Sequence, residues 1–180
     1  MITVADPVLR LAIRSYWRDP PDAVLFDLLR SAERRNRELG CSGALFWGYQ
    51  SYVQVLEGPE DGLRVLGAAI LSDRRHAPLC WSYMTAPDRA LAPTLPLGLV
   101  DTTEAAGMGL ALEVRRMAEA PADDRLLEAA ADLVLHMACR KYPAATLVRP
   151  AAPAALAGPA ASRPGASPRP GHGAPRPRVA

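Results

Sequence analysis

Apolar and aromatic positions cluster in three short segments of the first third of the chain. Residues 8–14 alternate loosely between apolar and polar side chains, which predicts a half-buried strand. Residues 44–47 and 52–56 are mostly apolar or aromatic, and the short polar segment 48–51 separates them. This arrangement is typical of a β-hairpin.

Two more strand patterns follow later in the chain. Residues 79–84 predict a fourth strand, and residues 95–100 predict a fifth. We expect the fifth strand at a sheet edge, because Pro93 and Pro96 cannot donate backbone hydrogen bonds to a neighbouring strand.

Two amphipathic helices are predicted between these strands. The first starts at residues 20–22, Pro-Pro-Asp, where proline is tolerated and an aspartate interacts favourably with the helix dipole. It ends at Gly40, which permits a left-handed backbone conformation. The second starts at residues 58–61. The apolar stripes of the two helices comprise Val24, Leu25, Leu28, Leu29 and Ala32 in the first, and Leu63, Leu66, Ile70 and Leu71 in the second.

The resulting order of elements is βαββαββ, which predicts a ferredoxin-like α+β fold. In such a fold, two helices pack on one face of a mixed sheet. Residues 103–119 and 122–141 predict two further helices, which Pro121 separates. We therefore expect a domain at residues 8–100, a C-terminal helical pair at 101–142 and a tail at 143–180.

The tail differs from the rest of the chain in composition and charge. No acidic residue follows Asp132, whereas seven basic residues do; the part up to Asp132 has 14 basic against 19 acidic residues, a net charge of −5. From about Pro150 the sequence is mostly Pro, Ala, Gly, Ser and Arg, a composition that predicts disorder. The composition favours a solubilising tail, and contact of its basic residues with nucleic acid or an anionic membrane stays an alternative.

Several functional classes find no support in the sequence. The cysteines Cys41, Cys80 and Cys139 are odd in number and scattered, which fits neither a disulfide framework nor a metal site. We expect free thiols and a cytoplasmic location, since we find no secretory signal and no apolar run of membrane-spanning length. Neither a phosphate-binding glycine loop nor a nucleophile motif is present, so we expect no enzymatic activity.

Two side-chain amides stand out in the segment 35–59. Asn36 lies near the end of the first helix, and Gln54 lies within the third strand, both among apolar or structural residues. A buried amide without hydrogen-bond partners costs about 1–3 kcal/mol. Each residue alone is as well explained by a helix end or an exposed strand position, but together they suggest a site for a flat ligand with donors and acceptors on its edge.

This segment resembles the BLUF family, the flavin-binding blue-light sensor domains. The resemblance covers residues 8–100 and rests on four ordered features: Arg14-Ser15 after the first strand, Asn36, the segment Ser42-Gly43-Ala44-Leu45-Phe46 with Gln54 in Gln-x-Leu-Glu-Gly-Pro, and Asp73-Arg74-Arg75-His76. It implies that FAD binds between the two helices. It also implies that Asn36 and Gln54 contact the flavin edge and that Arg75 and His76 lie near its other polar edge.

The chain departs from the family at one position that matters for photochemistry. The family has a tyrosine on the first strand directly before Arg-Ser, and this tyrosine supplies an electron and a proton to the excited flavin. Here that position is Ile13, which has no hydroxyl and cannot be oxidised in this way. The family's Trp and Met near the fifth strand fall on Leu95 and Leu97, so the resemblance implies a more apolar site.

Two functions are therefore predicted as alternatives. The first is an FAD-binding blue-light sensor that signals through a protein partner such as a regulator, with its photocycle impaired by Ile13. The second is a light-insensitive BLUF-like module that acts through protein interaction or responds to redox state. In either case the chain could form a homo-oligomer.

The composition of the tail generates a first prediction. We expect a variant truncated after Pro150 to fold with an unchanged melting temperature, because the removed residues have no core-forming periodicity. Thermal unfolding followed by circular dichroism checks this, and the loss of a cooperative transition in the truncated variant would contradict it.

Overall fold

The computed structural model describes residues 8–18, 25–48, 51–86, 88–100 and 108–147. Its centre is a five-stranded mixed sheet in the order β4-β1-β3-β2-β5. The strands are β1 (Val8–Trp17), β2 (Ser42–Trp47), β3 (Ser51–Gly58), β4 (His76–Ala86) and β5 (Gly98–Val100). All neighbours are antiparallel except β2 and β5, which are parallel.

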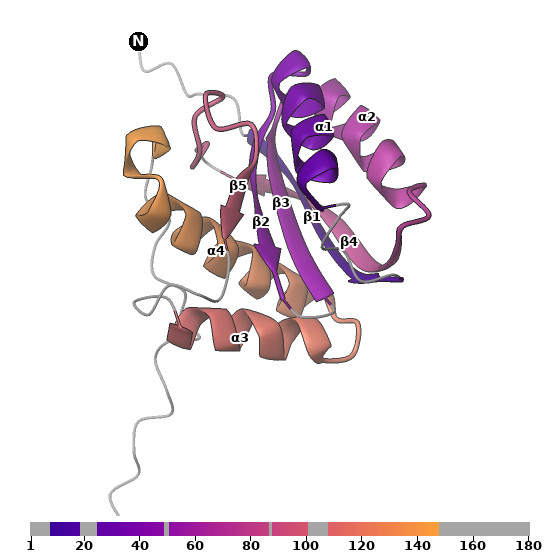
Figure 1. The fold of residues 1–180 in the computed structure, drawn as a ribbon. Coiled ribbons are helices and arrows are strands. Elements are labelled where there is room, and N and C mark those ends of the chain that lie inside the picture. The colour runs from indigo at the N-terminus through magenta and orange to yellow at the C-terminus, as the bar shows by residue number, and fades with distance from the viewer. Residues whose placement is uncertain (1–7, 19–24, 49–50, 87, 101–107, 148–180) are drawn as a thin grey trace, which may run out of the picture.

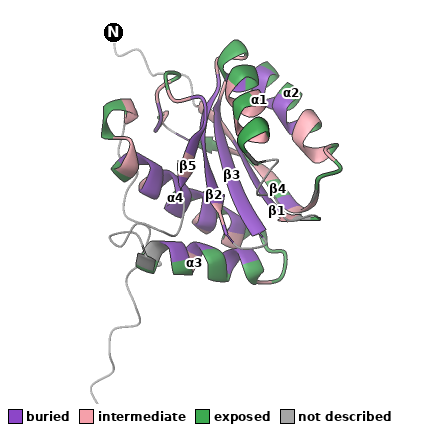
Figure 2. Cartoon of the chain, viewed as in Figure 1, coloured by how far each residue is buried: buried purple, intermediate pink, exposed green. Residues whose placement is uncertain are grey.

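Four helices cover the two faces of this sheet. Figure 1 shows α1 (Leu25–Glu38) and α2 (Glu60–Leu71) on one face, and α3 (Met108–Glu119) and α4 (Asp124–Lys141) on the other. The predicted α+β fold with two helices on one face is confirmed. Figure 2 shows that the strands are buried between these layers, whereas the outer sides of the helices are exposed.

The alternation of side chains along β1 and β3 divides the interior into two cores. Leu11, Ile13 and Leu56 belong to the core beneath α1 and α2. Ala12 and Val55 belong to the larger core that α3 and α4 close. Because successive residues of a strand point to opposite faces, β1 and β3 each contribute to both cores.

The predicted helix boundaries have local physical causes in the structure. Gly40 follows α1 with φ of 66°, the left-handed conformation that ends the helix. Asp123 caps α4, since its carboxylate accepts hydrogen bonds from the backbone N–H groups of Arg125 (2.8 Å) and Leu126 (3.2 Å). The predicted start of the first helix at residues 20–22 lies outside the described residues.

The fifth strand is shorter than predicted, at three residues. Leu95 N–H donates a hydrogen bond to Ala92 O within a turn, so this residue turns back on the preceding chain instead of pairing with β2 through its N–H. The expectation of an edge strand is correct, because β5 pairs only with β2.

A buried carboxylate joins the sheet to the segment that precedes β5. The Glu57 side chain is completely buried; Arg10 Nε donates to it at 2.6 Å, and the backbone N–H groups of Ala90 and Leu91 donate at 2.9 and 3.0 Å. Arg89 adds hydrogen bonds to Gly40 O and Glu57 O at 2.9 and 3.0 Å. The segment after Asp88 is therefore held against β2 and β3.

A second buried charge joins β1 to the C-terminal helices. The Arg14 guanidinium donates to Met117 O at 2.9 Å and to Ala120 O at 2.7 Å, carbonyl groups at and just beyond the end of α3. A cation is favourable there because the carbonyl end of a helix carries partial negative charge. Arg14 thus anchors α3 to the centre of the sheet.

The first five residues of the predicted tail, 143–147, are ordered and pair with the segment that precedes β5. Pro143–Ala145 form a short 3-10 helix, Ala92 N–H donates to Ala145 O at 2.8 Å, and Leu147 N–H donates to Ala90 O at 2.9 Å. Backbone pairing, which composition does not reveal, fixes this segment. Residues 148–180 lie outside the described residues.

The Glu57 network generates the second prediction. We expect Glu57→Gln to lower the free energy of unfolding by about 3 kcal/mol, because breaking a buried ion pair leaves the Arg10 charge with only the more distant Asp132, at 3.6 Å, to compensate it. Glu60→Gln is a suitable control, since Glu60 forms an exposed pair with Arg64 and such pairs contribute little. Urea unfolding of both variants measures the difference; equal midpoints would contradict the role of Glu57.

Candidate functional site: a cavity between α1, α2 and the sheet

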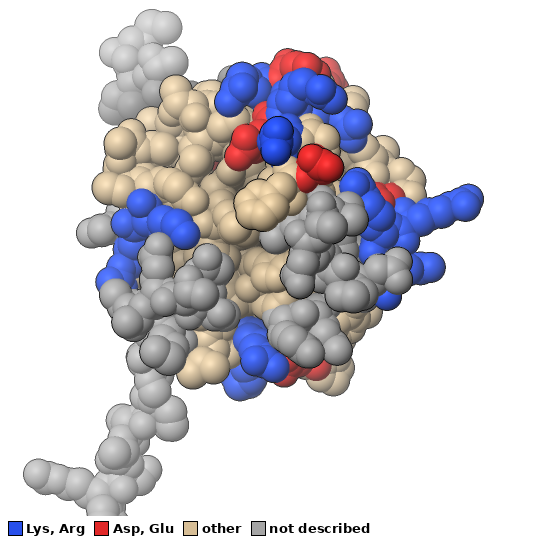
Figure 3. Space-filling view, viewed as in Figure 1, with Lys and Arg blue, Asp and Glu red and all other residues tan. Residues whose placement is uncertain are grey.

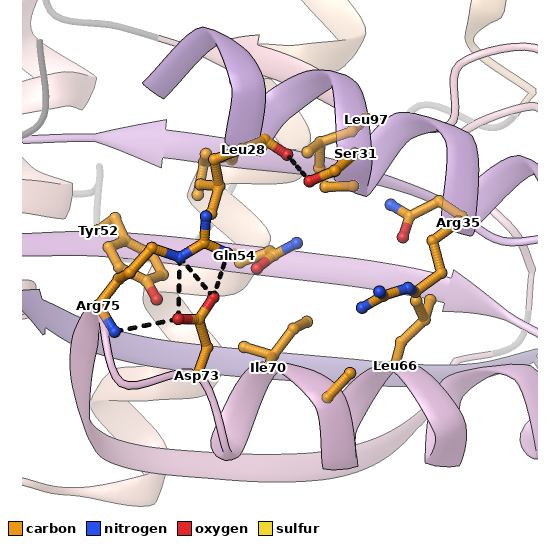
Figure 4. Close-up of a pocket in the computed structure, with 14 residues that line it drawn as sticks. Leu28, Ser31, Arg35, Tyr52, Gln54, Leu66, Ile70, Asp73, Arg75 and Leu97 are labelled. Carbon is orange, nitrogen blue, oxygen red and sulfur yellow. Dashed lines mark hydrogen bonds and ion pairs between the residues drawn. The ribbon is translucent and has the colours of Figure 1, made fainter. Parts of the chain in front are cut away.

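A cavity opens between α1, α2 and the central strands. It encloses about 630 Å³ of space, part of which is open to solvent. Figure 4 shows side chains that line it from α1, β3, α2 and the turn before β4. They are Leu28, Ser31, Ala32, Arg35, Asn36, Leu45, Tyr52, Gln54, Leu66, Ala69, Ile70, Asp73, Arg75 and Leu97.

Gln54 lies at the centre of the sheet wall of this cavity. Its side chain is only 7% exposed, and no described residue donates a hydrogen bond to its amide or accepts one from it. A buried amide normally has partners, since leaving it unpaired costs about 1–3 kcal/mol. Gln54 therefore presents an unpaired donor and acceptor to whatever fills the cavity.

Asn36 is the second amide that lines the cavity. It is 1% exposed, and its Nδ2 donates a hydrogen bond of 2.8 Å to Pro96 O. This bond fixes the orientation of the amide, because only the NH₂ group can donate to a carbonyl. The carbonyl oxygen of Asn36 has no partner among the described residues. Asn36 therefore offers a hydrogen-bond acceptor to a ligand in the cavity.

Arg75 is the third predicted site residue that lines the cavity. It pairs with Asp73, whose carboxylate accepts from Arg75 Nε at 2.9 and 3.0 Å and from Nη2 at a shorter distance. In Figure 4 this pair lies at the end of the cavity beside Tyr52. The ion pair raises the pKa of the Arg75 guanidinium above its usual value, so its charge is permanent.

The structure locates His76 by its backbone. It is the first residue of β4 and pairs in register with Trp17. Its place in the chain directly after Arg75 agrees with the sequence pattern. A flavin contact through its side chain remains a prediction.

Ile13 lies directly beside Gln54, on the neighbouring strand β1. The two residues are direct partners in the β1–β3 ladder, and Ile13 is fully buried in the core beneath α1 and α2. An isoleucine there packs against its neighbours but offers no hydrogen bond to the Gln54 amide. The β1 side of Gln54 is therefore apolar.

Tyr52 is a lining residue that the sequence analysis did not assign to the site. It precedes Gln54 by two residues in β3, so both side chains point to the same face of the sheet. The phenol is 4% exposed, and burial raises its pKa well above the usual value; the nearby Ser15 hydroxyl opposes that shift. The even spacing from Gln54 was the signal that could have identified it.

A comparison with protein families identifies the domain that carries this cavity. The model described as "BLUF: Sensors of blue-light using FAD" matches residues 9–88. Residues 9–88 are a BLUF domain. The BLUF domain is a flavin-binding blue-light sensor, and the matched region contains β1, α1, β2, β3, α2 and β4, which together form most of the cavity wall.

Solved structures of BLUF proteins resemble the chain. The dark-state structure of the BLUF protein BlrB is 28% identical, with a TM-score of 0.51, and the match covers 62% of this chain and 84% of BlrB. The ground state of BlsA is 21% identical, with a TM-score of 0.53, and 71% of this chain and 87% of BlsA are covered.

The chain also resembles part of a longer protein that is described as an enzyme. A bacterial light-regulated adenylyl cyclase is 20% identical, with a TM-score of 0.54; the match covers 67% of this chain but 36% of the cyclase. At this identity the match shows the fold alone. No curated protein matches the chain.

Two further findings concern the described part of the chain. It contains no helix that is long and apolar enough to span a membrane. It also contains no cluster of three or more His, Cys, Asp or Glu residues that could hold a metal ion.

The unpaired amide generates the third prediction. We expect Gln54→Leu to leave the free energy of unfolding of the flavin-free BLUF domain unchanged or to raise it by about 1 kcal/mol, because a buried group without partners is replaced by an apolar one of similar size. Asn36→Ala should instead lower it by about 1–3 kcal/mol, since Pro96 O loses its donor. Denaturant unfolding of the two variants checks this, and equal destabilisation would show that Gln54 has a protein partner.

Proposed function

We propose that the BLUF domain of this chain binds FAD in the cavity between α1 and α2 and acts as a non-enzymatic sensor for a protein partner. The observation that carries the proposal is the buried Gln54 amide, which is unpaired in the described part of the chain and faces the cavity. A flavin ring has carbonyl oxygens, ring nitrogens and an N–H group along one edge, which complement an amide.

The residues that line the cavity suit such a ring. Apolar side chains from both helices and the sheet, among them Leu28, Leu66, Ile70 and Leu97, form walls for a flat aromatic ligand. Asn36 offers an acceptor, which suits the flavin N–H, and Gln54 offers both a donor and an acceptor. Arg75 and His76 would lie near the other polar edge of the ring.

Arg35 supports a flavin nucleotide over a flavin without phosphate. Its guanidinium lines the cavity and forms no ion pair with the described residues. A free guanidinium is a strong partner for phosphate oxygens. The FAD in the family description has such oxygens, whereas riboflavin has none.

When bound, the flavin supplies the absorption of blue light, and the protein supplies what surrounds it. The amides of Asn36 and Gln54 hold the ring edge, and the apolar walls exclude water from it. Ile13 supplies neither an electron nor a proton, so the contribution that the family obtains from β1 is absent here.

The position of Ile13 favours one second candidate. In this alternative the domain is a light-insensitive module that acts through protein interaction or responds to redox state. An absorption spectrum of the purified protein tests the interaction form of this alternative, since a pure interaction module has no flavin bands.

The partner is expected to be a protein, as in the sequence analysis. On the face seen in Figure 3, basic and acidic side chains are interspersed, and this face lacks the single basic surface typical of nucleic-acid binding. The C-terminal helices α3 and α4 offer a surface for a regulator or for a second copy of the chain. A cytoplasmic location stays a prediction that rests on the three free cysteines.

The cavity generates the fourth prediction, which tests the cofactor. We expect the wild-type protein to retain FAD, and Gln54→Leu to weaken its affinity by about 5- to 150-fold, because the flavin edge then loses hydrogen bonds worth about 1–3 kcal/mol. Titration of flavin-free protein with FAD, followed by flavin fluorescence, measures this. Riboflavin titrated in parallel should bind more weakly than FAD.

Ser31→Ala is the matched control for this experiment. Ser31 lines the same cavity, but its hydroxyl donates to Leu28 O within α1 at 2.8 Å. Its removal should leave the affinity for FAD unchanged. An unchanged affinity in Gln54→Leu as well would refute the assignment of the site.

A further inference from the structure

We propose that Tyr52 donates the electron and the proton that an excited flavin in this cavity receives, in place of the phenol that β1 lacks. The proposal rests on flavin binding in the cavity, as proposed above. It concerns a position on β3 instead of β1.

The sheet geometry brings Tyr52 close to any ring that Gln54 holds. Tyr52 and Gln54 are two residues apart on β3 and point to the same face, which separates them by about 7 Å along the strand. Both line the cavity. A ring that is hydrogen-bonded to Gln54 is broad enough to span this separation.

Tyr52 also lies near Ile13, the position at which the family has its tyrosine. Ile13 pairs with Gln54 and Ser15 pairs with Tyr52 in the same ladder. Tyr52 is therefore the diagonal neighbour of Ile13, about 7–8 Å away across the strands. Both side chains belong to the core beneath α1 and α2, and that of Tyr52 also lines the cavity.

The surroundings of Tyr52 suit coupled loss of an electron and a proton. Burial raises the pKa of the phenol, so it is protonated at neutral pH. The charges of Asp73 and Arg75 act on it from the end of the cavity, where Asp73 raises its pKa and Arg75 lowers it. Figure 4 shows its hydroxyl end directed toward that ion pair.

The proposed step conserves electrons and atoms. The O–H bond of Tyr52 breaks, and one electron and one proton pass to the flavin ring that light has excited. Tyr52 remains as a neutral phenoxyl radical. Both particles return to Tyr52 when the pair recombines, so no further oxidant or reductant is consumed.

Other described aromatic side chains are placed less favourably. Tyr52 is the one aromatic residue among the described residues that line the cavity. Trp47 pairs with Tyr52 from β2 and does not line the cavity. Tyr16 is an odd number of positions from Ile13 on β1 and points to the other face. Trp81 lies beyond Ile13, on β4.

The test measures the fluorescence lifetime of bound flavin. Full-length wild type, Tyr52→Phe and the control variants Trp47→Phe and Tyr16→Phe are loaded with FAD, and the ratio of flavin to protein is determined first. We expect Tyr52→Phe to retain flavin and to lengthen the lifetime several-fold, because its quencher is gone. Both controls should keep the wild-type lifetime.

Two readouts separate electron and proton donation from a merely structural role. In heavy water the wild-type lifetime should lengthen, whereas that of Tyr52→Phe should not change further. Transient absorption of the wild type should show a tyrosine radical after the light pulse. The melting temperature of flavin-free Tyr52→Phe should equal that of the wild type, which shows that the fold is intact.

Each other outcome overturns the proposal in a distinguishable way. An unchanged lifetime in Tyr52→Phe with flavin retained refutes the role of Tyr52 and leaves flavin binding intact. A lengthened lifetime in Trp47→Phe assigns the donor to the indole. If Tyr52→Phe loses its flavin, the transient spectrum of the wild type decides, and the absence of a tyrosine radical refutes the proposal. A wild type that binds no flavin refutes both proposals.

Discussion

The register between β1 and β3 is the constraint on which the rest of the site depends. It places Ile13 against Gln54 and Ser15 against Tyr52. Since the side-chain period of a strand is two, a slip of one residue in β3 would turn Gln54 and Tyr52 away from the cavity that they line. The hydrophobic cores on both faces resist such a slip, because Val53 and Val55 would exchange places with Tyr52, Gln54 and Leu56.

A second constraint closes the cavity from the side of β5. The buried carboxylate of Glu57 holds the backbone of Ala90 and Leu91, and from there the chain runs along β2 to Pro96 and Leu97. Pro96 accepts the hydrogen bond from Asn36, and Leu97 lines the cavity. The ion pair of Glu57 with Arg10 on one face of the sheet thus helps to position Pro96 and Leu97, which contribute to the cavity on the other face.

The order of strands and helices was predictable because each has a strong period, and Gly40 ends the first helix as its conformational freedom predicts. The meeting of Asn36, Gln54 and Arg75 at one cavity followed from the resemblance, not from periodicity. The Pro96 carbonyl and the Glu57 network could not be predicted, since both are contacts between segments far apart in the chain. The pairing of residues 143–147 with the segment 90–92 was missed for the same reason, because its alanines and proline resemble the low-complexity sequence that follows.

The two amides of the cavity differ in freedom. Asn36 is held by Pro96, so its NH₂ group points to the protein and its oxygen keeps one polarity toward a ligand. Gln54 has no such tether among the described residues, and a half-turn about its last bond exchanges its NH₂ group for its oxygen. A molecule bound between them would meet a fixed acceptor at Asn36, and at Gln54 a group that can present either a donor or an acceptor. Asn36 would therefore keep the same hydrogen-bonding group toward a bound molecule. Only Gln54 could rotate its amide in response to a change in the hydrogen bonds that the bound molecule offers.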